Sequence, residues 1–502
     1  MTRKKRSLPT PITILMLVII LASICTWIIP AGQYNKLKYD DDNLIFTLSA
    51  PGGDTVLPVQ QSTLDSLGIR IALEKFTGGE IRKPVSIPGT YRKLESNPQG
   101  FIETLQAPIK GIMDSIDIIL FILIIGGFMF VFNETGAMVK GITSLSHSLK
   151  GREQWLIIIL TLMFSFFAAS YGMAEEALVF YPLLVPLFLA AGYDLLVPLA
   201  VIFGGTMLGG IPAFSNPFST IIASNAAGIN WMDGLIERLI MFGVSNVILI
   251  WYILRYAKKI RKDPSLSLVK LIDGDVKPPY DTDIRTDGPP PALGWKNRLL
   301  IFIYIGTFIA MICGVVFLDW WTTEMSALFL GSSVLVAILM RINEKVFVRE
   351  FIKGAESLLS VAFIVGIARA VTIVLNDGKV SDSILFYTAN IVDGMSPAVF
   401  ILILMVFYAL FSFFISSSSG MAVLTMPIIG ALIIIVNIPG REVVNSYNYG
   451  MALMSFVSPT GLILPSLALT GVSIRTWFRF VTPLMIILTL LCAGFLVAGL
   501  FI

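Results

Sequence analysis

Long apolar runs, separated by short charged segments, constrain this chain more than any other feature of its sequence. Only 14% of its 502 residues carry a charge, whereas soluble domains average about 25%. Runs such as 12–29, 116–132 and 483–500 are long enough to cross a bilayer as helices. Because the hydrocarbon core leaves no water for unpaired backbone groups, helices of this length predict an all-α integral membrane protein.

Several function classes are disfavoured by composition. The net charge of +3 is too small to predict a nucleic-acid partner. The three cysteines, Cys25, Cys313 and Cys492, lie far apart in apolar stretches and do not predict a disulfide framework. A single histidine, His147, leaves little basis for a metal site or a Ser-His dyad. We therefore expect no enzyme, no metal and no cofactor, with a proton or sodium as the coupling ion if there is one.

The charged segments predict the topology. The opening MTRKKRS places the N-terminus in the cytoplasm by the positive-inside rule. A cleaved signal peptide is the alternative, but no small-residue cleavage site follows the first run. Alternating the segments gives nine crossings and two re-entrant hairpins, with the C-terminus outside a bacterial-type inner membrane. The predicted units are residues 1–32 (tail and first span), 33–104 (extracytoplasmic loop), 105–262 (first repeat, with hairpin 155–191 and broken helix 195–229), 263–296 (cytoplasmic linker), 297–345 (two extra spans) and 346–502 (second repeat, with hairpin 397–437 and broken helix 446–471).

An internal repeat is the most informative pattern in the chain. The segment FSFFAASYGMA at 164–174 recurs as FSFFISSSSGMA at 411–422, and Asn133-Glu134 recurs as Asn376-Asp377, 243 residues later. Chance similarity between apolar spans does not easily explain one interval returning after gaps. The charge pattern places Lys110 outside and Lys353 inside, so we expect two inverted copies. Secondary transporters with inverted repeats bind substrate near the bilayer midplane, where helices are interrupted.

Both copies contain such an interruption. Prolines remove amide donors from 209–217 in the first copy and from 457–461 in the second. The polar residues there are candidates for binding substrate, although they could equally serve only to satisfy the broken backbone. They are Ser215, Asn216, Ser458 and Thr460.

The two hairpin tips differ in charge. The first tip carries Glu175 and Glu176, candidates for ion coupling or for binding an ammonium group, because unpaired carboxylates inside a membrane are costly. The alternative is a shallow hairpin with both acids in water. The second tip carries only serines, which we assign to substrate binding: Ser416, Ser417, Ser418 and Ser419.

Arg369 lies within the apolar span 356–375. One interpretation is a fork that binds a substrate carboxylate. The other is a buried structural ion pair, with Glu175 or Glu176 as the expected partner, and the two are compatible.

Several motifs resemble one family in order and spacing across nearly the whole chain. They are Ile-Pro-Ala-Gly-Gln-Tyr at 29–34, Gly-Met-Ala-Glu-Glu at 172–176, Ser-Asn-Pro-Phe at 215–218 and Gly-Ile-Ala-Arg at 366–369. This pattern resembles the YfcC/DcuC carriers, the anaerobic four-carbon dicarboxylate carrier family of the ion transporter superfamily. The resemblance implies a scaffold and a moving domain that work as an elevator, often in a homodimer. It implies a dicarboxylate or amino acid substrate, including basic amino-acid exchange.

The tips depart from the Ser-Asn-Thr signature that the resemblance would imply for sodium-coupled dicarboxylate carriers. A site with both signs of charge suits an amino acid at least as well as a dianion. A channel and an intramembrane enzyme with a serine nucleophile among Ser416–Ser419 remain alternatives.

Overall fold

A computed structural model describes residues 10–501, apart from 42, 51, 70, 78–80, 82–83, 138–139, 142–143, 145–150, 228, 281–293, 319, 321, 392–394 and 437. Three predictions lie outside the described residues: the basic N-terminal cluster, the connector with His147 and the proline-rich part of the 263–296 linker. The described part of that linker holds a 3-10 turn, η4 (Pro264–Leu266), and a short helix, α13 (Leu268–Ile272).

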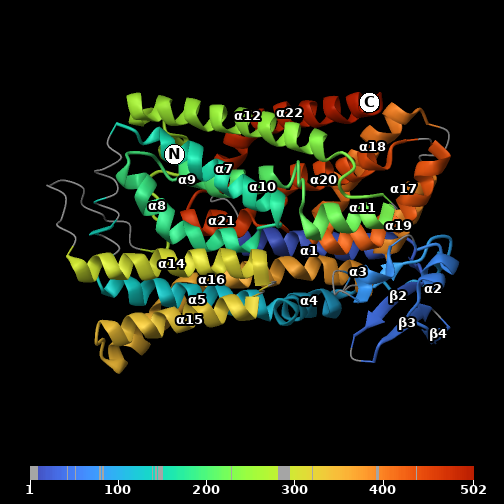
Figure 1. Cartoon of the computed structure of the whole chain (residues 1–502), viewed down its shortest axis with the longest axis horizontal. Helices are drawn as coiled ribbons and strands as arrows, with labels where there is room; N and C mark the ends of the chain where they lie inside the picture. Colours follow the sequence, from blue (N-terminus) through green and yellow to red (C-terminus); the bar gives the residue numbers. More distant parts are fainter. Residues whose placement is uncertain are drawn as a thin grey trace, which may run out of the picture.

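The helices form two layers (Figure 1). In the first, which we call the α16 layer, α5 and α16 pack along each other, with α1, α4, α14 and α15 beside them. Their bounds are α1 Pro11–Ile28, α4 Phe101–Asp114, α5 Ile116–Glu134, α14 Trp295–Leu318, α15 Thr322–Leu339 and α16 Glu344–Asp377.

The second layer, which we call the hairpin layer, contains both predicted hairpins and both broken helices. Its first-copy elements are α7 Gln154–Ser170, η1 Glu175–Phe180, α8 Tyr181–Ala190, α9 Leu196–Leu199, η2 Ala200–Gly204, α10 Gly205–Gly209, η3 Pro217–Ile221, α11 Ile222–Ala227 and α12 Leu235–Lys262. Its second-copy elements are α18 Pro397–Phe414, α19 Ser418–Val436, α20 Gly440–Ser455, α21 Ile463–Thr470 and α22 Ile474–Gly499.

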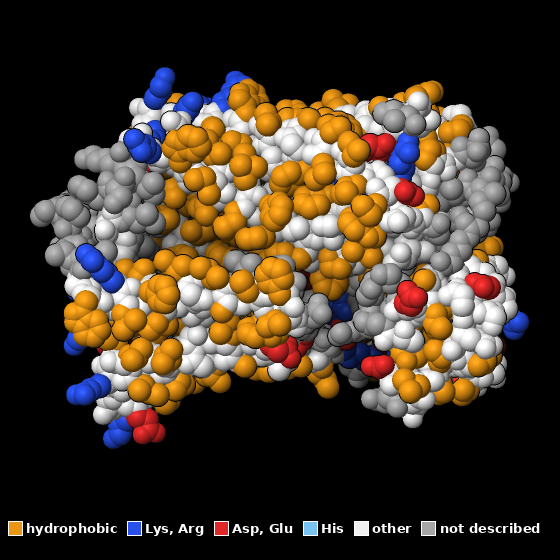
Figure 2. Space-filling view, in the orientation of Figure 1, with side chains coloured by type: hydrophobic (Ala, Val, Ile, Leu, Met, Phe, Trp, Pro, Cys, Tyr) orange, Lys and Arg blue, Asp and Glu red, His pale blue; other side chains and the backbone are white. Residues whose placement is uncertain are grey.

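Seven helices among the described residues are long and apolar enough to cross a membrane. Six of them, α1, α5, α12, α15, α16 and α22, coincide with predicted single crossings. The seventh, α18, is the first arm of the predicted second hairpin. Hydrophobic side chains cover the middle of the molecule, and Lys and Arg gather at its left end (Figure 2). This is the surface expected of a protein surrounded by lipid.

The helix bounds repeat at the interval found in the sequence. The first residue of α16 lies 243 residues after the first residue of α4, and the last residue of α16 lies 243 residues after the last residue of α5. The beginnings of α7 and α18 correspond in the same way, as do the ends of α11 and α21. The first copy differs in one respect: a break at Ser115 separates α4 from α5, whereas the matching helix of the second copy, α16, is continuous.

The matching helices α4–α5 and α16 run in opposite directions along each other. Gly111 of α4 lies against the backbone of Gly366, whereas Gly126 of α5 lies against the backbone of Gly354. Residue numbers therefore rise along one helix while they fall along the other. The absence of side chains at Gly126 and Gly354 lets the two backbones touch, as small residues do in membrane helix pairs.

The 33–104 segment contains a small β unit that the sequence analysis missed. Strand β1 (Gly32–Gln33) pairs with β6 (Arg92–Lys93), and a second antiparallel sheet has the order β4-β3-β2-β5. Its strands are β2 Lys36–Asp40, β3 Ile45–Ala50, β4 Gly53–Leu57 and β5 Val85–Ser86, accompanied by short helices α2 Gln61–Ser66 and α3 Leu73–Thr77. The all-α prediction thus holds for the membrane region and omits this unit. Leu37, Phe46 and Phe76 form its buried centre.

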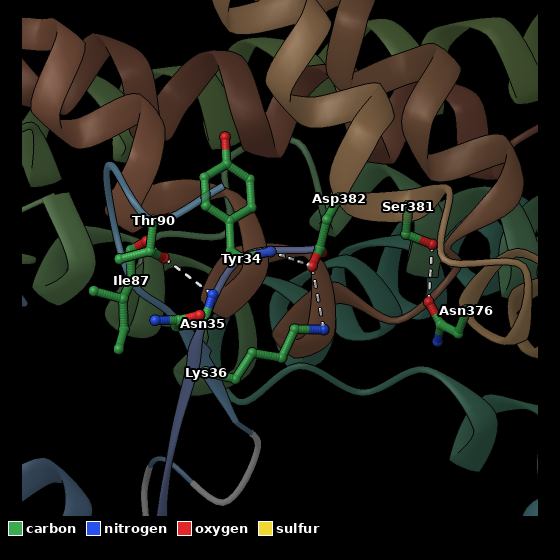
Figure 3. A network of polar contacts seen from close by, with 8 residues as sticks. All are labelled: Tyr34, Asn35, Lys36, Ile87, Thr90, Asn376, Ser381 and Asp382. Atoms are coloured by element: carbon green, nitrogen blue, oxygen red, sulfur yellow. Dashed lines mark hydrogen bonds and ion pairs between the residues drawn. The ribbon is translucent and has the colours of Figure 1, made fainter. Parts of the chain in front are cut away.

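The β unit is docked on the second copy through α17 (Ser381–Ile391), as Figure 3 shows. The carboxylate of Asp382 accepts a hydrogen bond from the Tyr34 amide at 3.1 Å and lies 3.6 Å from the Lys36 ammonium. The Tyr91 ring stacks on Phe386 with 4.0 Å between ring centroids. Burial raises the pKa of the Asp382 carboxyl, and the nearby Lys36 charge acts in the opposite direction.

Candidate substrate site

The first helix break is bound to the tip of its own hairpin. Its backbone turns sharply at Ala213, whose φ is +35°. The Asn216 side chain caps the segment after the break, because its Oδ1 accepts from the amides of Phe218 at 2.9 Å and Ser219 at 3.2 Å. Its Nδ2 donates to the Ala168 carbonyl at 3.2 Å, near the end of α7. The predicted residue Asn216 therefore links the break to the hairpin.

Each break also makes a hydroxyl-to-carbonyl hydrogen bond to the first arm of its hairpin. The Ser215 hydroxyl donates to the Ser170 carbonyl at 3.1 Å. In the second break, the Thr460 hydroxyl donates to the Phe413 carbonyl at 2.7 Å, and the Ser458 hydroxyl lies 2.7 Å from that of Thr460. Ser170 and Phe413 both lie in the last turn of the first arm of their hairpins, α7 and α18, so each break is fastened to the end of that arm. The four predicted break residues thus contribute structural contacts in addition to any binding role.

The first hairpin tip carries a buried carboxylate. Gly172 adopts a φ of +87°, and an added Cβ there would come within 2.8 Å of Asn216 Oδ1, so glycine lets the tip approach the break. Beyond it, η1 begins with Glu175 and Glu176. The Glu176 side chain is 7% exposed, and its carboxylate accepts from the Ala174 amide at 2.9 Å. The shallow-hairpin alternative, in which both acids lie in water, does not describe Glu176.

The second hairpin tip is uncharged, and hydroxyl groups hold it through hydrogen bonds to its backbone. Ser417 and Ser418 are partly buried, whereas Ser416 is exposed. The Ser417 hydroxyl accepts from the Gly420 amide at 3.2 Å, and the Ser418 carbonyl accepts from the Tyr447 hydroxyl at 2.7 Å. The Ser417 side chain therefore caps the first turn of α19, and α20 holds the tip from the side.

Arg369 has a partner other than the one expected from the sequence. Its Nε lies 2.6 Å from a carboxylate oxygen of Asp114, the last residue of α4, and the two side chains are 32% and 47% exposed. The expected pairing of Arg369 with Glu175 or Glu176 is wrong in this conformation. The reason is that α4 packs along α16, which brings Asp114 to the guanidinium, an approach that sequence order does not reveal. Arg369 thus belongs to the α16 layer, while the breaks and tips belong to the hairpin layer.

A polar bridge between the two copies was missed by sequence reasoning. The Asn448 amide of α20 donates to the Thr220 hydroxyl of η3 at 2.8 Å, and that hydroxyl in turn donates to the Ala213 carbonyl. Asn448, Thr220 and the adjacent Ser219 are fully buried, and within the described part of the chain Ser219 Oγ and Asn448 Oδ1 have no hydrogen-bond partner. Buried polar atoms without partners are costly unless a ligand or water satisfies them. The polar run Asn445-Ser-Tyr-Asn448, unusual in a chain of mostly apolar helices, was the available signal.

Comparison with known proteins identifies the family to which this arrangement belongs. The family model described as C4-dicarboxylate anaerobic carrier, DcuC, matches residues 8–500. The chain belongs to this family. It is therefore a multi-pass membrane transporter, and the resemblance stated from its motifs is confirmed.

Two curated relatives span nearly the same length. A protein of Haemophilus influenzae (strain ATCC 51907 / DSM 11121 / KW20 / Rd), described as uncharacterised, is 37% identical over 96% of this chain and 95% of its own length. The protein of Escherichia coli (strain K12) named "Putative basic amino acid antiporter YfcC" is 25% identical over 95% of this chain and 93% of its own length.

Two solved transporters are similar over nearly their full length. One is MtrF of Neisseria gonorrhoeae, from a class of antimetabolite efflux pumps, with a TM-score of 0.38 and 15% identity over 99% of this chain and 96% of the other. The second is the YdaH transporter of Alcanivorax borkumensis, with a TM-score of 0.38 and 13% identity over 97% of each chain. Both TM-scores are low, so family membership rests on the sequence match.

Proposed function

We propose that the chain is a secondary active transporter of a small carboxylate-bearing solute that works by alternating access in the inner membrane. The substrate is an amino acid, with basic amino-acid exchange as the first case, or a dicarboxylate. The observation that supports this most is the pair of matched helix breaks, each fastened to its own hairpin tip and joined across the copies by Asn448 and Thr220. Interrupted helices with freed backbone groups are the usual substrate sites of inverted-repeat carriers.

Charge at the first tip favours an amino acid. Glu176 is buried beside Glu175, and an ammonium or guanidinium group of a substrate would neutralise a carboxylate there. A carboxylate of the substrate would find a neutral donor at the break, namely the buried Ser219 hydroxyl, which has no hydrogen-bond partner among the described residues. A dicarboxylate lacks the cationic group that the two acids would attract. The relative named as a basic amino acid antiporter agrees with this preference.

The proposed cycle moves the hairpin layer against the α16 layer in an elevator-like step. The two inverted copies supply the two conformations, as in other inverted-repeat carriers. In this cycle Glu175 or Glu176 exchanges between a proton and the substrate cation, and Arg369 leaves Asp114 to bind a substrate carboxylate at one stage. The C-terminus lies outside, and the protein is a homodimer.

Counterflow in proteoliposomes tests this function. Vesicles preloaded with unlabelled arginine should accumulate labelled arginine transiently, while vesicles preloaded with succinate should not. Empty liposomes control for leak. If vesicles preloaded with succinate instead accumulate labelled succinate, while arginine gives no counterflow, the substrate would be a dicarboxylate. A flux that does not saturate and is not stimulated by internal solute would indicate a channel, and chemically altered solute would indicate an enzyme.

A further inference from the structure

An open basic pocket lies at the far end of the hairpin layer from the β unit. It has a volume of about 620 Å³ and is lined by the C-terminal turns of α12 and by the residues that begin α7: Gly151, Glu153, Gln154, Arg255, Lys258, Lys259, Arg261 and Lys262. This volume falls within the range of about 300–1,000 Å³ that is typical of ligand pockets. Lys and Arg side chains gather at the corresponding end of α12 in Figure 2.

Most of the positive charge in this pocket is uncompensated. Glu153 is engaged by Arg261, whose two terminal nitrogens lie 3.1 Å and 3.3 Å from its carboxylate oxygens. The other four cations have no carboxylate within ion-pair distance among the described residues. These four, Arg255, Lys258, Lys259 and Lys262, follow the helical spacing i, i+3, i+4 and i+7, so they share one face of α12.

The same face of α12 is apolar and exposed along the rest of its length. Ile240, Val244, Val247 and Trp251 are 53%, 37%, 69% and 52% exposed and continue the spacing toward Arg255. The Arg255 guanidinium lies 5.5 Å from the centroid of the Trp251 ring. An aromatic ring therefore lies where the apolar part of this helix face meets its basic part.

Helix α7, which packs beside α12, presents a parallel apolar stripe. Trp155, Ile159, Leu162 and Phe166 are exposed by 53%, 58%, 38% and 48% and recur at helical spacing. The basic pocket therefore lies at one end of two adjacent apolar stripes that are exposed on the surface of the protein. A ligand that matches both parts has an anionic head and long hydrocarbon chains.

We propose that this pocket binds the headgroup phosphate of an anionic phospholipid, whose acyl chains lie along the exposed faces of α7 and α12. Anionic lipids are enriched at the cytoplasmic leaflet and bind basic pockets between transmembrane helices. The Arg255 guanidinium offers two parallel N–H donors to a phosphate, and the three lysines supply point charges around it. A soluble phosphate anion would use the same cations and would leave the apolar stripes without a role.

Native mass spectrometry of the purified full-length protein, with added phosphatidylglycerol or phosphatidylcholine, tests the assignment. Lys258→Gln/Lys262→Gln should bind phosphatidylglycerol roughly thirty-fold more weakly than the parent, from the contribution of each basic residue near a membrane surface. The control Lys296→Gln/Arg298→Gln removes two cations at the start of α14 that do not line the pocket, and should bind like the parent. Equal loss in both double variants would overturn the proposal, as would equal binding of phosphatidylcholine by the parent. Displacement of phosphatidylglycerol by millimolar inorganic phosphate would assign the pocket to a soluble anion instead.

Discussion

Replacing Gly126 with alanine probes the contact on which the α16 layer is built. A Cβ at this position would run into the backbone carbonyl of Gly354 and approach Leu358, and the reciprocal substitution at Gly354 would meet the backbone of Gly126. Because the obstacle is backbone, no side-chain rotation can relieve it. The two helices must separate, and with them the matched halves of the layer.

The magnitude follows from two opposing effects. Overpacking a well-packed contact costs about 1–3 kcal/mol and occasionally more. Alanine gains up to about 1 kcal/mol over glycine in a helix interior. We expect the net effect of Gly126→Ala to be a loss of about 1–2 kcal/mol, at the upper end because the contact is backbone to backbone. Gly306→Ala in α14 is the matched control, since nothing lies within 4 Å of its added Cβ, and it should stabilise by about 0.5–1 kcal/mol.

Thermal unfolding in one detergent, at one scan rate, orders the three proteins. A fixed rate matters because membrane proteins commonly unfold irreversibly. The expected order of midpoints is Gly126→Ala below the parent and Gly306→Ala above it. The double variant Gly126→Ala/Gly354→Ala should lose less than the sum of the single losses, since both act on one contact. A midpoint for Gly126→Ala equal to that of Gly306→Ala would refute the close crossing of α5 and α16.

Four other predictions concern the site and the β unit. Arg369→Lys keeps the charge and loses the bidentate fork, so it should weaken substrate binding at least tenfold with normal folded yield; unchanged binding would make the arginine structural. Glu175→Gln and Glu176→Gln, tested singly, should show which glutamate binds the proton and which binds the substrate cation. Loss of proton-driven accumulation with intact exchange identifies the proton site, and loss of both identifies the partner of the substrate. Transport like that of the parent from about pH 5 to 8 in both variants would reject the assignment. Thr460→Val should lower stability by about 1 kcal/mol by removing its hydrogen bond to the second hairpin, and a parental unfolding midpoint would contradict that contact. Burial raises the pKa of the Asp382 carboxyl above its ordinary value of 3.8, so the protonated form stabilises the docked β unit at low pH, and the unfolding midpoint should fall as pH rises through the raised pKa. Asp382→Asn should remove this fall, and a pH profile of the midpoint that is the same as the parent's would show that the carboxyl does not titrate on docking.

The membrane architecture was largely readable from the sequence because it rests on local signals. Apolar length sets the crossings, and the repeat interval sets the correspondence between copies, which the helix bounds then follow. Proline positions located both breaks. These features need no knowledge of which helix packs against which.

The missed features all depend on contacts between distant segments. The strands of the β unit pair across short, mixed polar sequences, whose pattern is weak without knowledge of their partners. Asp114 meets Arg369 only because α4 lies along α16. Thr220 and Asn448 are ordinary polar residues until η3 and α20 come together. The irregular backbone of the site is thus visible in the proline pattern, whereas the side chains that bridge the copies become recognisable only in the folded structure.

The inverted arrangement of the two copies is the central claim, because the proposed transport cycle depends on it. Lys110 lies beside Asp377 at one end of α16, at 2.8 Å, whereas Lys353 pairs with Glu350 near the other end, at 3.2 Å. The decisive measurement is labelling of single cysteines at Lys110 and Lys353 in closed vesicles, in a background without the three native cysteines. An impermeant maleimide should label the two positions from opposite sides of the membrane. Labelling of both from the same side would contradict the inverted repeat and the alternating-access cycle built on it.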